Sequence, residues 1–363
     1  MNKPSRRTFI KGVAGSGLLA TSALFGFSDL NDEAQKKKHA KYLFKFSSPY
    51  ASKDFLFTPH VHQEIKSCIE KYTRNEVYVE IIDNGLDGIG SPIANLVKFG
   101  RSQGGLLSVS NFSAKVPEID LVNIPYWCSE DAAFIRLFDS KPWRKHVLTK
   151  VEAHQITILF PYLTGARTAT TIKSFQQDGG SMRAPEDFKG IHYRVPNSKV
   201  LHKFYELAGA RPYFIPWGLC ARNARRGRFQ ALDPGVIGLY SGPDNLRNEI
   251  AVITELELVP DAWVAIANTD FINSLPVRIR HPFLEAMQEI RARQLQHYQR
   301  SKALCSKGFK QLGVPIIKLT EAEKSVFASQ YGHQNPAWNS YKKELLGKNG
   351  IQTFEALYKA AQG

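Results

Sequence analysis

The sequence lacks the long apolar runs and the paired cysteines that mark two large classes of protein. Outside the N-terminal segment, no uncharged apolar stretch approaches the ~20 residues that a helix needs to cross a bilayer. The chain of 363 residues has only four cysteines, and none of them forms a C-x-x-C pair. Cys68 falls on the apolar side of an amphipathic pattern with Ile65 and Ile69, which indicates a buried thiol. We therefore expect a globular, soluble body without a disulfide framework.

The common signatures of catalysis and cofactor binding are also missing. The sequence contains no G-x-S-x-G elbow, no G-x-x-x-x-G-K-[ST] loop and no H-E-x-x-H helix. The glycines from Gly85 to Gly90 have the wrong spacing for a dinucleotide-binding loop and indicate a turn between a strand and a helix. His60 and His62 have no cysteine nearby and do not indicate a metal site. We predict no metal and no cofactor, and enzymatic activity is left unsupported rather than excluded.

The chain is basic, but it does not have the pattern of a nucleic-acid-binding protein. Lysine and arginine number 48 against 33 aspartates and glutamates, which gives a formal net charge of +15. The densest basic cluster, from Arg222 to Arg228, is typical of a solvated helix end, and no basic tail interleaved with aromatic residues is present. This balance favours solubility and anionic small ligands, so we expect no nucleic-acid partner.

The N-terminal segment has the pattern of an export signal. Residues 5–11, SRRTFIK, match the twin-arginine pattern and precede a charge-free run from Gly12 to Phe27. Small residues at Thr21 and Ala23 complete the parts of a cleavable signal. We predict a twin-arginine signal peptide over residues 1–28 and a periplasmic location. Its removal takes away four basic residues and no acidic ones, so the mature protein has a formal charge of +11.

Hydrophobic patterns predict two regions in which strands alternate with helices. The expected strands are 42–46, 76–82, 106–109, 156–160, 191–195, 212–215, 231–240 and 263–267. The expected helices are 61–72, 92–99, a helix that Ser198 caps and Gly209 ends, and a long helix over 281–307. This alternation predicts an α/β fold of β-α-β units with largely parallel sheets.

One stretch, residues 185–196 (PEDFKGIHYRVP), indicates a binding site. A short helical turn leads into a strand, and Arg194 stands near the end of that strand, just before a helix. In α/β proteins ligands bind at the carboxyl ends of strands, where loops and helix N-termini meet. An arginine there can hold a carboxylate through two parallel charge-assisted hydrogen bonds. The alternative for a lone arginine is a surface ion pair.

The same stretch resembles the extracytoplasmic solute-binding proteins of TRAP transporters, the tripartite ATP-independent periplasmic systems. The signature P-x-D-x-K-G-x-x-x-R-V-P is present as Pro185, Asp187, Lys189, Gly190, Arg194, Val195 and Pro196. The resemblance continues through Gly209-Ala210-x-Pro212, Ile215-Pro216-Trp217, Gly227 and Leu275-Pro276, and covers nearly all of the mature chain. It implies that Arg194 binds a ligand carboxylate. Gly165-Ala166-Arg167 resembles a second position that often supplies a cation.

The chain departs from the family pattern after residue 217. Members commonly have Ser-Glu and then V-D-G, where this chain has Gly218-Leu219 and Phe229-Gln230-Ala231. We expect the segment from Ala231 to Tyr240 to form the far wall of the site instead. Neither sialic acid nor a simple dicarboxylate can therefore be carried over as the ligand.

The resemblance implies a two-lobed periplasmic binding protein of type II, with chain crossings near residues 158–163 and 257–262. Lobe 1 is expected to comprise 41–160 and 261–290, and lobe 2 to comprise 161–260 and 291–363. The long helix that begins near His281 should brace both lobes. A ligand would favour closure by contacting both.

The predicted function is capture of an organic acid anion and its delivery to the membrane subunits of a TRAP transporter. Besides Arg194, the candidate binding residues are Arg167 for an anionic group, Trp217 for apolar stacking, and Asn111, Asp233 and Tyr240 for hydroxyl or keto oxygens. Trp217 has a core position as its alternative, and Asn111 has a loop cap. Two other functions stay open: a periplasmic enzyme exported by the twin-arginine route, and the binding subunit of an ATP-driven importer.

Overall fold

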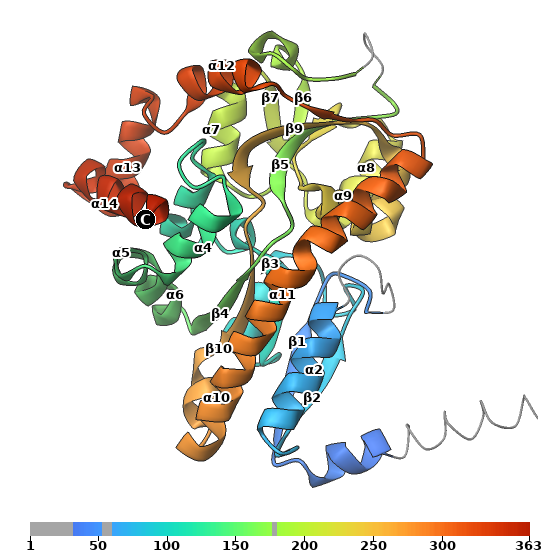
Figure 1. Cartoon of the computed structure of the whole chain (residues 1–363), viewed down its shortest axis with the longest axis vertical. Coiled ribbons are helices and arrows are strands. Elements are labelled where there is room, and N and C mark those ends of the chain that lie inside the picture. The colour runs from blue at the N-terminus through green and yellow to red at the C-terminus, as the bar shows by residue number, and fades with distance from the viewer. Residues whose placement is uncertain (1–31, 53–59, 176–179) are drawn as a thin grey trace, which may run out of the picture.

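The computed structural model describes residues 32–52, 60–175 and 180–363. The predicted signal peptide, residues 1–28, lies outside the described residues. The strands form two separate sheets, and one long helix, α11, runs past both (Figure 1). The strands are β1 (Tyr42–Ser47), β2 (Val77–Ile82), β3 (Gly104–Ser108), β4 (Ile156–Tyr162), β5 (Ala166–Ile172), β6 (His192–Val195), β7 (Arg211–Phe214), β8 (Ala231–Leu232), β9 (Ile250–Pro260), β10 (Trp263–Asn268) and β11 (Ile316–Lys318).

The helices cover these sheets and link them. They are α2 (His60–Tyr72), α3 (Ser91–Lys98), α4 (Asp131–Asp139), α5 (Lys141–Trp143), α6 (Thr149–Ala153), α7 (Lys199–Leu207), α8 (Cys220–Arg225), α9 (Val236–Ser241), α10 (Thr269–Ser274), α11 (Val277–Gln311), α12 (Glu321–Tyr331), α13 (Asn339–Leu346) and α14 (Gly350–Gln362). In the part of the chain that the structure describes, no helix has the length and apolar character needed to span a bilayer.

Both sheets are mixed. Sheet A has the order β2-β1-β3-β10-β4, with β1 parallel to β2 and β3, and β10 antiparallel to β3 and β4. Sheet B has the order β11-β9-β5-β8-β6-β7, and here β6 is parallel to its two neighbours while β5 is antiparallel to β8 and β9. The prediction of largely parallel sheets is therefore correct for one part of each sheet and wrong for the rest.

Two strands that the sequence patterns did not predict, β5 and β9, carry the chain between the sheets. The chain leaves β4 of sheet A, passes through residues 163–165 and enters β5 of sheet B. It returns from β9 through residues 261–262 to β10 of sheet A. Because β5 and β9 pair with each other, the two crossings lie side by side.

Local sequence explains the elements that surround the crossings. In α2, Val61, Ile65 and Ile69 are buried on one face of the helix, as the spacing predicted, and Cys68 is buried with them. Ser198 caps α7 by accepting a hydrogen bond from the N–H of Leu201 at 3.0 Å. The long helix α11 begins at Val277 rather than His281, and it contacts β4 of sheet A and β11 of sheet B.

The predicted strand over 231–240 is wrong. The strand β8 stops at Leu232, and the helix α9 begins at Val236. Pro234 has no N–H to continue a sheet ladder, so the strand ends before it. A Cβ at Gly235 would lie 2.6 Å from the carbonyl oxygen of Thr164, so the chain approaches the β4–β5 crossing closely at a position that only glycine fits.

The C-terminal helix α14 packs against α4, and α13 packs against α14 (Figure 1). Arg136 of α4 donates from Nε to the carbonyl of Ala361 at 2.9 Å, and Gln362 donates to the carbonyl of Trp127 at 2.8 Å. The end of the chain is thereby attached to the segment that follows β3.

Candidate functional site

A small cavity lies between the two sheets, where the carboxyl ends of β3 and β6 face the chain crossings. Its volume is about 30 Å³. It is lined by Ser108, Asn111, Arg167, Arg194, Pro196, Trp217, Pro234, Gly238, Asp261 and Trp263. Because these residues come from both sheets, and Asp261 comes from the β9–β10 crossing, a molecule in this cavity would contact both lobes.

Arg194 is part of β6 and only 3% exposed. Its Nε and Nη2 both donate to the carbonyl oxygen of Ile215, at 3.0 and 2.9 Å. Its Cζ lies 5.5 Å from the centre of a Trp217 ring. One edge of the guanidinium is thus held by the main chain. The remaining N–H groups on Nη1 and Nη2 are the ones that can donate to a carboxylate.

Arg167, in β5, is only 2% exposed and lies between two carboxylates. Its Nη1 is 3.2 Å from Oδ1 of Asp233, and its Nη2 is 3.1 Å from Oδ1 of Asp261. Burial acts to lower the pKa of Arg167, but Asp261 and Asp233 outweigh it, so the pKa is raised and the side chain stays protonated. The second cation of the cavity is therefore already paired.

Asp233 lies behind the two arginines and is fully buried. Besides its pair with Arg167, its Oδ1 is 3.8 Å from Nη1 of Arg194. Burial raises its pKa, while the arginines act in the opposite direction. Asp261, from the β9–β10 crossing, accepts a hydrogen bond from the N–H of Gly235 at 2.9 Å. Asp261 lines the cavity, and the sequence patterns did not single it out.

Several neutral polar groups at the cavity have no hydrogen-bond partner among the described residues. These are the hydroxyl of Ser108 and the indole nitrogens of Trp217 and Trp263. The hydroxyl of Tyr50 is also buried without one, and its ring lies 5.1 Å from the Trp263 ring. Buried polar groups ordinarily have partners, so these groups are positioned to bond a polar ligand. Single serines and tryptophans at element ends carry no sequence signal for such a role.

The structure brings Trp217 and Asn111 to the cavity wall. Trp217 is also part of the hydrophobic core, with 7% of its surface exposed. It therefore occupies both positions considered from the sequence, one in the core and one at the wall of the cavity. Asn111 is half-buried at the end of a short helix, η1 (Val109–Asn111), and its main-chain carbonyl accepts from Ser91 at 2.8 Å. A Cβ at Gly90 would lie 2.7 Å from Oδ1 of Asn111, so Gly90 leaves room for that side chain.

Tyr240 does not line the cavity. Its ring packs edge-on against Phe309 of α11, with 5.1 Å between ring centres. The expectation rested on a strand, in which residues two apart share a face. In the helix α9, residues two apart point in nearly opposite directions. Gly238 therefore faces the cavity, whereas Tyr240 faces α11.

The rims of the two lobes touch beside the cavity. Ile89 precedes α3 of the sheet A lobe, and Gly218 belongs to the turn η5 (Trp217–Leu219) of the sheet B lobe. A methyl group at Gly218 would lie 3.1 Å from Cδ1 of Ile89. Ser113 also donates to the carbonyl of Asn197, at 2.7 Å. The structure thus has the lobes in contact next to the cavity.

Other residues of the 185–196 stretch have structural tasks. The carboxylate of Asp187 accepts hydrogen bonds from the N–H groups of Arg183 and Ala184, at 2.7 and 2.8 Å, and so holds the start of the turn. Gly190 has a φ of 75°, a conformation that glycine adopts without strain. These residues fix the entry into β6, and the strand then delivers Arg194 to the cavity.

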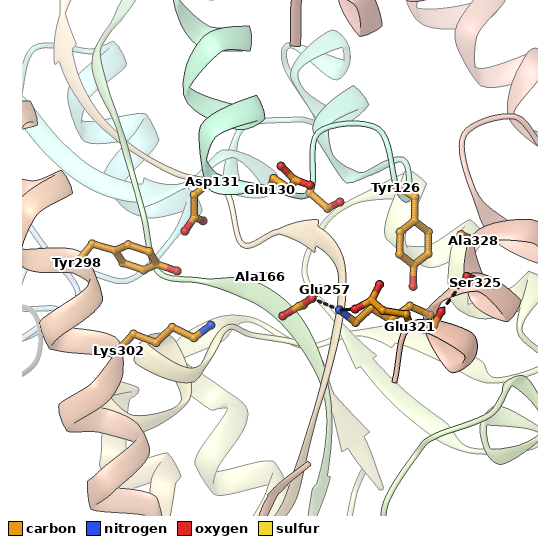
Figure 2. Close-up of a pocket in the computed structure, with 12 residues that line it drawn as sticks. Tyr126, Glu130, Asp131, Ala166, Glu257, Tyr298, Lys302, Glu321, Ser325 and Ala328 are labelled. Atoms are coloured by element: carbon orange, nitrogen blue, oxygen red, sulfur yellow. Dashed lines mark hydrogen bonds and ion pairs between the residues drawn. The ribbon is translucent and has the colours of Figure 1, made fainter. Parts of the chain in front are cut away.

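A larger groove, of about 460 Å³, lies beside α11 and α12 (Figure 2). Among its charged residues, the carboxylates Glu130, Asp131, Glu257 and Glu321 outnumber the amines of Lys302 and Lys324. Lys324 is paired with Glu257 at 2.6 Å and with Glu321 at 2.8 Å. An excess of carboxylates repels an organic anion, so the smaller cavity is the better candidate site. No group of three potential metal ligands occurs within the described ranges.

The two mixed sheets, the double crossing and the long helix define a two-lobed binding protein of the periplasmic type II class. Residues 50–344 match the family model described as bacterial extracellular solute-binding protein, family 7, also called DctP. The chain belongs to this family, to which the solute-binding proteins of TRAP transporters belong. The resemblance predicted from residues 185–196 is thus confirmed.

Curated relatives of the chain are distant. The C4-dicarboxylate-binding periplasmic protein DctP of Rhodobacter capsulatus is 25% identical over 235 residues, which cover 62% of this chain and 65% of the relative. The 2,3-diketo-L-gulonate-binding periplasmic protein YiaO of Escherichia coli is 18% identical, over 90% of each chain.

Solved structures share the fold. A sugar acid binding protein of Advenella mimigardefordensis, in complex with galactonate, has a TM-score of 0.78 at 17% identity, covering 89% of this chain and 98% of that one. A TRAP periplasmic solute-binding protein of Sulfurospirillum deleyianum with bound succinate has a TM-score of 0.73 at 18% identity, covering 88% and 99%.

Proposed function

We propose that this protein captures an organic acid in the periplasm by its carboxylate and delivers it to the membrane subunits of a TRAP transporter. The observation that carries the proposal is Arg194, buried in an interlobe cavity with one edge of its guanidinium fixed by Ile215. A guanidinium fixed in this way is already oriented, so less conformational entropy is lost when it binds a carboxylate.

The relatives support the choice of ligand class. The ligands of these relatives are C4-dicarboxylates, 2,3-diketo-L-gulonate, galactonate and succinate, which are all organic acids. The roles of Trp217, Asn111 and Arg167 belong to this proposal: the first two would contact the body of the ligand, and Arg167 would orient Asp261 and Asp233. Tyr240 is left out.

The proposal includes closure of two lobes. The lobes would be 41–160 with 261–290, and 161–260 with 291–363. They would move about the crossings, and the ligand would stabilise the closed arrangement because it contacts both. Export by the twin-arginine signal of residues 1–28 is part of the same proposal and accounts for a periplasmic location.

The two other functions predict different observations. A periplasmic enzyme would change its ligand chemically, whereas a binding protein releases it unchanged. We expect mass spectrometry to recover every bound acid intact after long incubation with metal-replete protein, and an altered product would favour the enzyme. The subunit of an ATP-driven importer would be encoded beside an ATPase gene, and a TRAP protein beside two membrane subunits without one.

A thermal-shift screen of the mature protein against organic acids tests the ligand class. We expect a carboxylic acid to raise the melting temperature, because a ligand that binds only the folded state stabilises it. Its amide or methyl ester, which lacks the charge, should not. Stabilisation by the ester as strongly as by the acid would contradict the proposal.

A further inference from the structure

The formal charges around the cavity cancel before a ligand binds. Arg167 and Arg194 contribute two positive charges, and Asp233 and Asp261 contribute two negative ones. All four side chains are at most 4% exposed, so water screens them poorly. Among the described residues that line the cavity there is no lysine and no histidine to add a further positive charge.

We propose that the ligand carries a single carboxylate and a neutral, oxygen-rich remainder, so that the site selects hydroxy or keto monocarboxylates and rejects dicarboxylates. This inference rests on the proposed function, in which Arg194 holds the carboxylate. One carboxylate gives the cavity one net negative charge. A second carboxylate adds a second net negative charge. Both aspartates would repel this charge, and each arginine already has an anionic neighbour, so no free cation compensates it.

A further buried carboxyl group, Asp120, is close enough to Arg167 to interact with its charge. Asp120 is buried and lies at the start of α7, where its Oδ2 accepts from the N–H of Val200 at 3.1 Å. Asn123 donates to its other oxygen at 2.8 Å. Arg167 thus has a third acidic neighbour and is not free to pair with a second ligand carboxylate.

The neutral groups of the cavity suit the uncharged end of such a ligand. The hydroxyl of Ser108 and the indole N–H groups of Trp217 and Trp263 can donate to hydroxyl or keto oxygens. Asp261 can accept a hydrogen bond from a ligand hydroxyl. A neutral hydrogen bond satisfies an oxygen, but it does not compensate a full buried charge as an arginine does.

Matched acid pairs test this inference on the mature wild-type protein. Glycerate and tartronate, erythronate and meso-tartrate, and gluconate and glucarate differ only in a terminal CH₂OH that becomes a carboxylate. Titration calorimetry at pH 7 and one fixed ionic strength should show, for every pair that binds, that the monocarboxylate binds at least about tenfold more tightly. Equal or tighter binding of the dicarboxylates would overturn the inference and leave the proposed function standing. Binding of no acid, in these pairs or in the wider screen, would overturn both.

Two variants test the physical cause. Asp261→Asn and Asp233→Asn each remove one negative charge beside the cavity. At position 261 the asparagine oxygen can still accept the hydrogen bond from the N–H of Gly235. In each variant, the ratio of the Kd of the dicarboxylate to the Kd of its monocarboxylate partner should fall by about tenfold. The matched control is Asp244→Asn, which removes an exposed partner of Arg225 that does not line the cavity and should leave the ratio unchanged. A ratio that neither cavity variant changes would refute the charge argument, and the wild-type pairs decide the inference if a variant fails to fold.

Discussion

Replacing Arg194 by lysine should weaken both the ligand complex and the protein without ligand. Arg194 donates twice to the carbonyl of Ile215 and still has N–H groups for a ligand. A lysine ammonium is a single point on a flexible stem and cannot satisfy both partners in that geometry. Losing one charge-assisted hydrogen bond to the ligand should cost about 1.5 to 3 kcal/mol, which is roughly tenfold to more than a hundredfold in Kd. The carbonyl of Ile215 is buried too, so the free energy of unfolding without ligand should fall by about 1 to 3 kcal/mol.

Two measurements separate these effects. Calorimetric titration with the acid found in the screen gives the affinity, and urea unfolding without ligand gives the stability. The control is Arg225→Lys, because Arg225 lies in an exposed pair with Asp244 and Glu249. Exposed pairs contribute about 0 to 1 kcal/mol, so this variant should change neither quantity by more than that.

The refuting result is specific. If Arg194→Lys lowers the stability but binds the acid as tightly as the wild type, then Arg194 only supports the main chain at Ile215. The carboxylate would have to be held elsewhere, and the proposed orientation of the ligand would be wrong.

Three further perturbations test closure, export and acid stability. In Gly218→Leu the added side chain should clash with Ile89, keep the two lobes from closing fully and weaken ligand binding by about tenfold or more, with Gly218→Ala intermediate. Equal affinities in calorimetry would show that lobe closure does not depend on this contact. Changing Arg6 and Arg7 together to lysine should keep the protein in the cytoplasm, and normal periplasmic accumulation on cell fractionation would contradict the signal assignment. Burial lowers the pKa of His62 to about 4, below its ordinary value of about 6.5. Below pH 6.5 the unfolded state therefore binds a proton that the folded state does not, and the free energy of unfolding falls by about 3 kcal/mol as the pH drops from 6.5 through 4. In urea unfolding from pH 7 to 4, His62→Gln should lose less stability than the wild type, and parallel pH curves would refute the effect.

The sequence predicted best the elements whose causes are local. The turn before β6, the strand itself and the cap of α7 lie within one short stretch, and Asp187, Gly190 and Ser198 determine them through neighbours in the chain. Amphipathic spacing likewise predicted α2 and most of α11. Arg194 could be placed at the end of a strand because this position depends on those same elements.

The strands that cross between the sheets escaped prediction because their partners are distant in sequence. The strand β5 reads ARTATTI, with four of its positions polar or charged, and it is nevertheless almost entirely buried. Its hydroxyls are bonded within the fold: Thr168 to the carbonyl of Pro234 at 2.9 Å, and Thr171 to the carbonyl of Gly180 at 2.8 Å. Such a strand lacks the apolar alternation that indicates burial, since these hydroxyls are bonded by segments 66 and 9 residues away.

The charge balance of the cavity could not be predicted for the same reason. Arg167, Asp233 and Asp261 come from three separate segments, and only the pairing of β5 with β8 and β9 brings them within 3.2 Å. From the sequence alone, Arg167 is a second cation that could bind an anionic ligand. In the structure its charge is already paired with Asp233 and Asp261, so the cavity has one arginine, Arg194, to hold a ligand carboxylate instead of two.

This difference explains why the motif predicts the ligand class but not the ligand. Arg194 lies within the stretch that carries the family resemblance, and in the proposed function it would hold one carboxylate. The groups that would face the rest of the ligand, Ser108, Trp263 and Asp261, lie outside that stretch at the ends of sheet A strands and at a crossing. Because the two sets of residues belong to different segments, the neutral end of the cavity can differ among proteins that share the arginine. In the proposed site, the ligand would therefore be selected by residues that the recognisable motif does not contain.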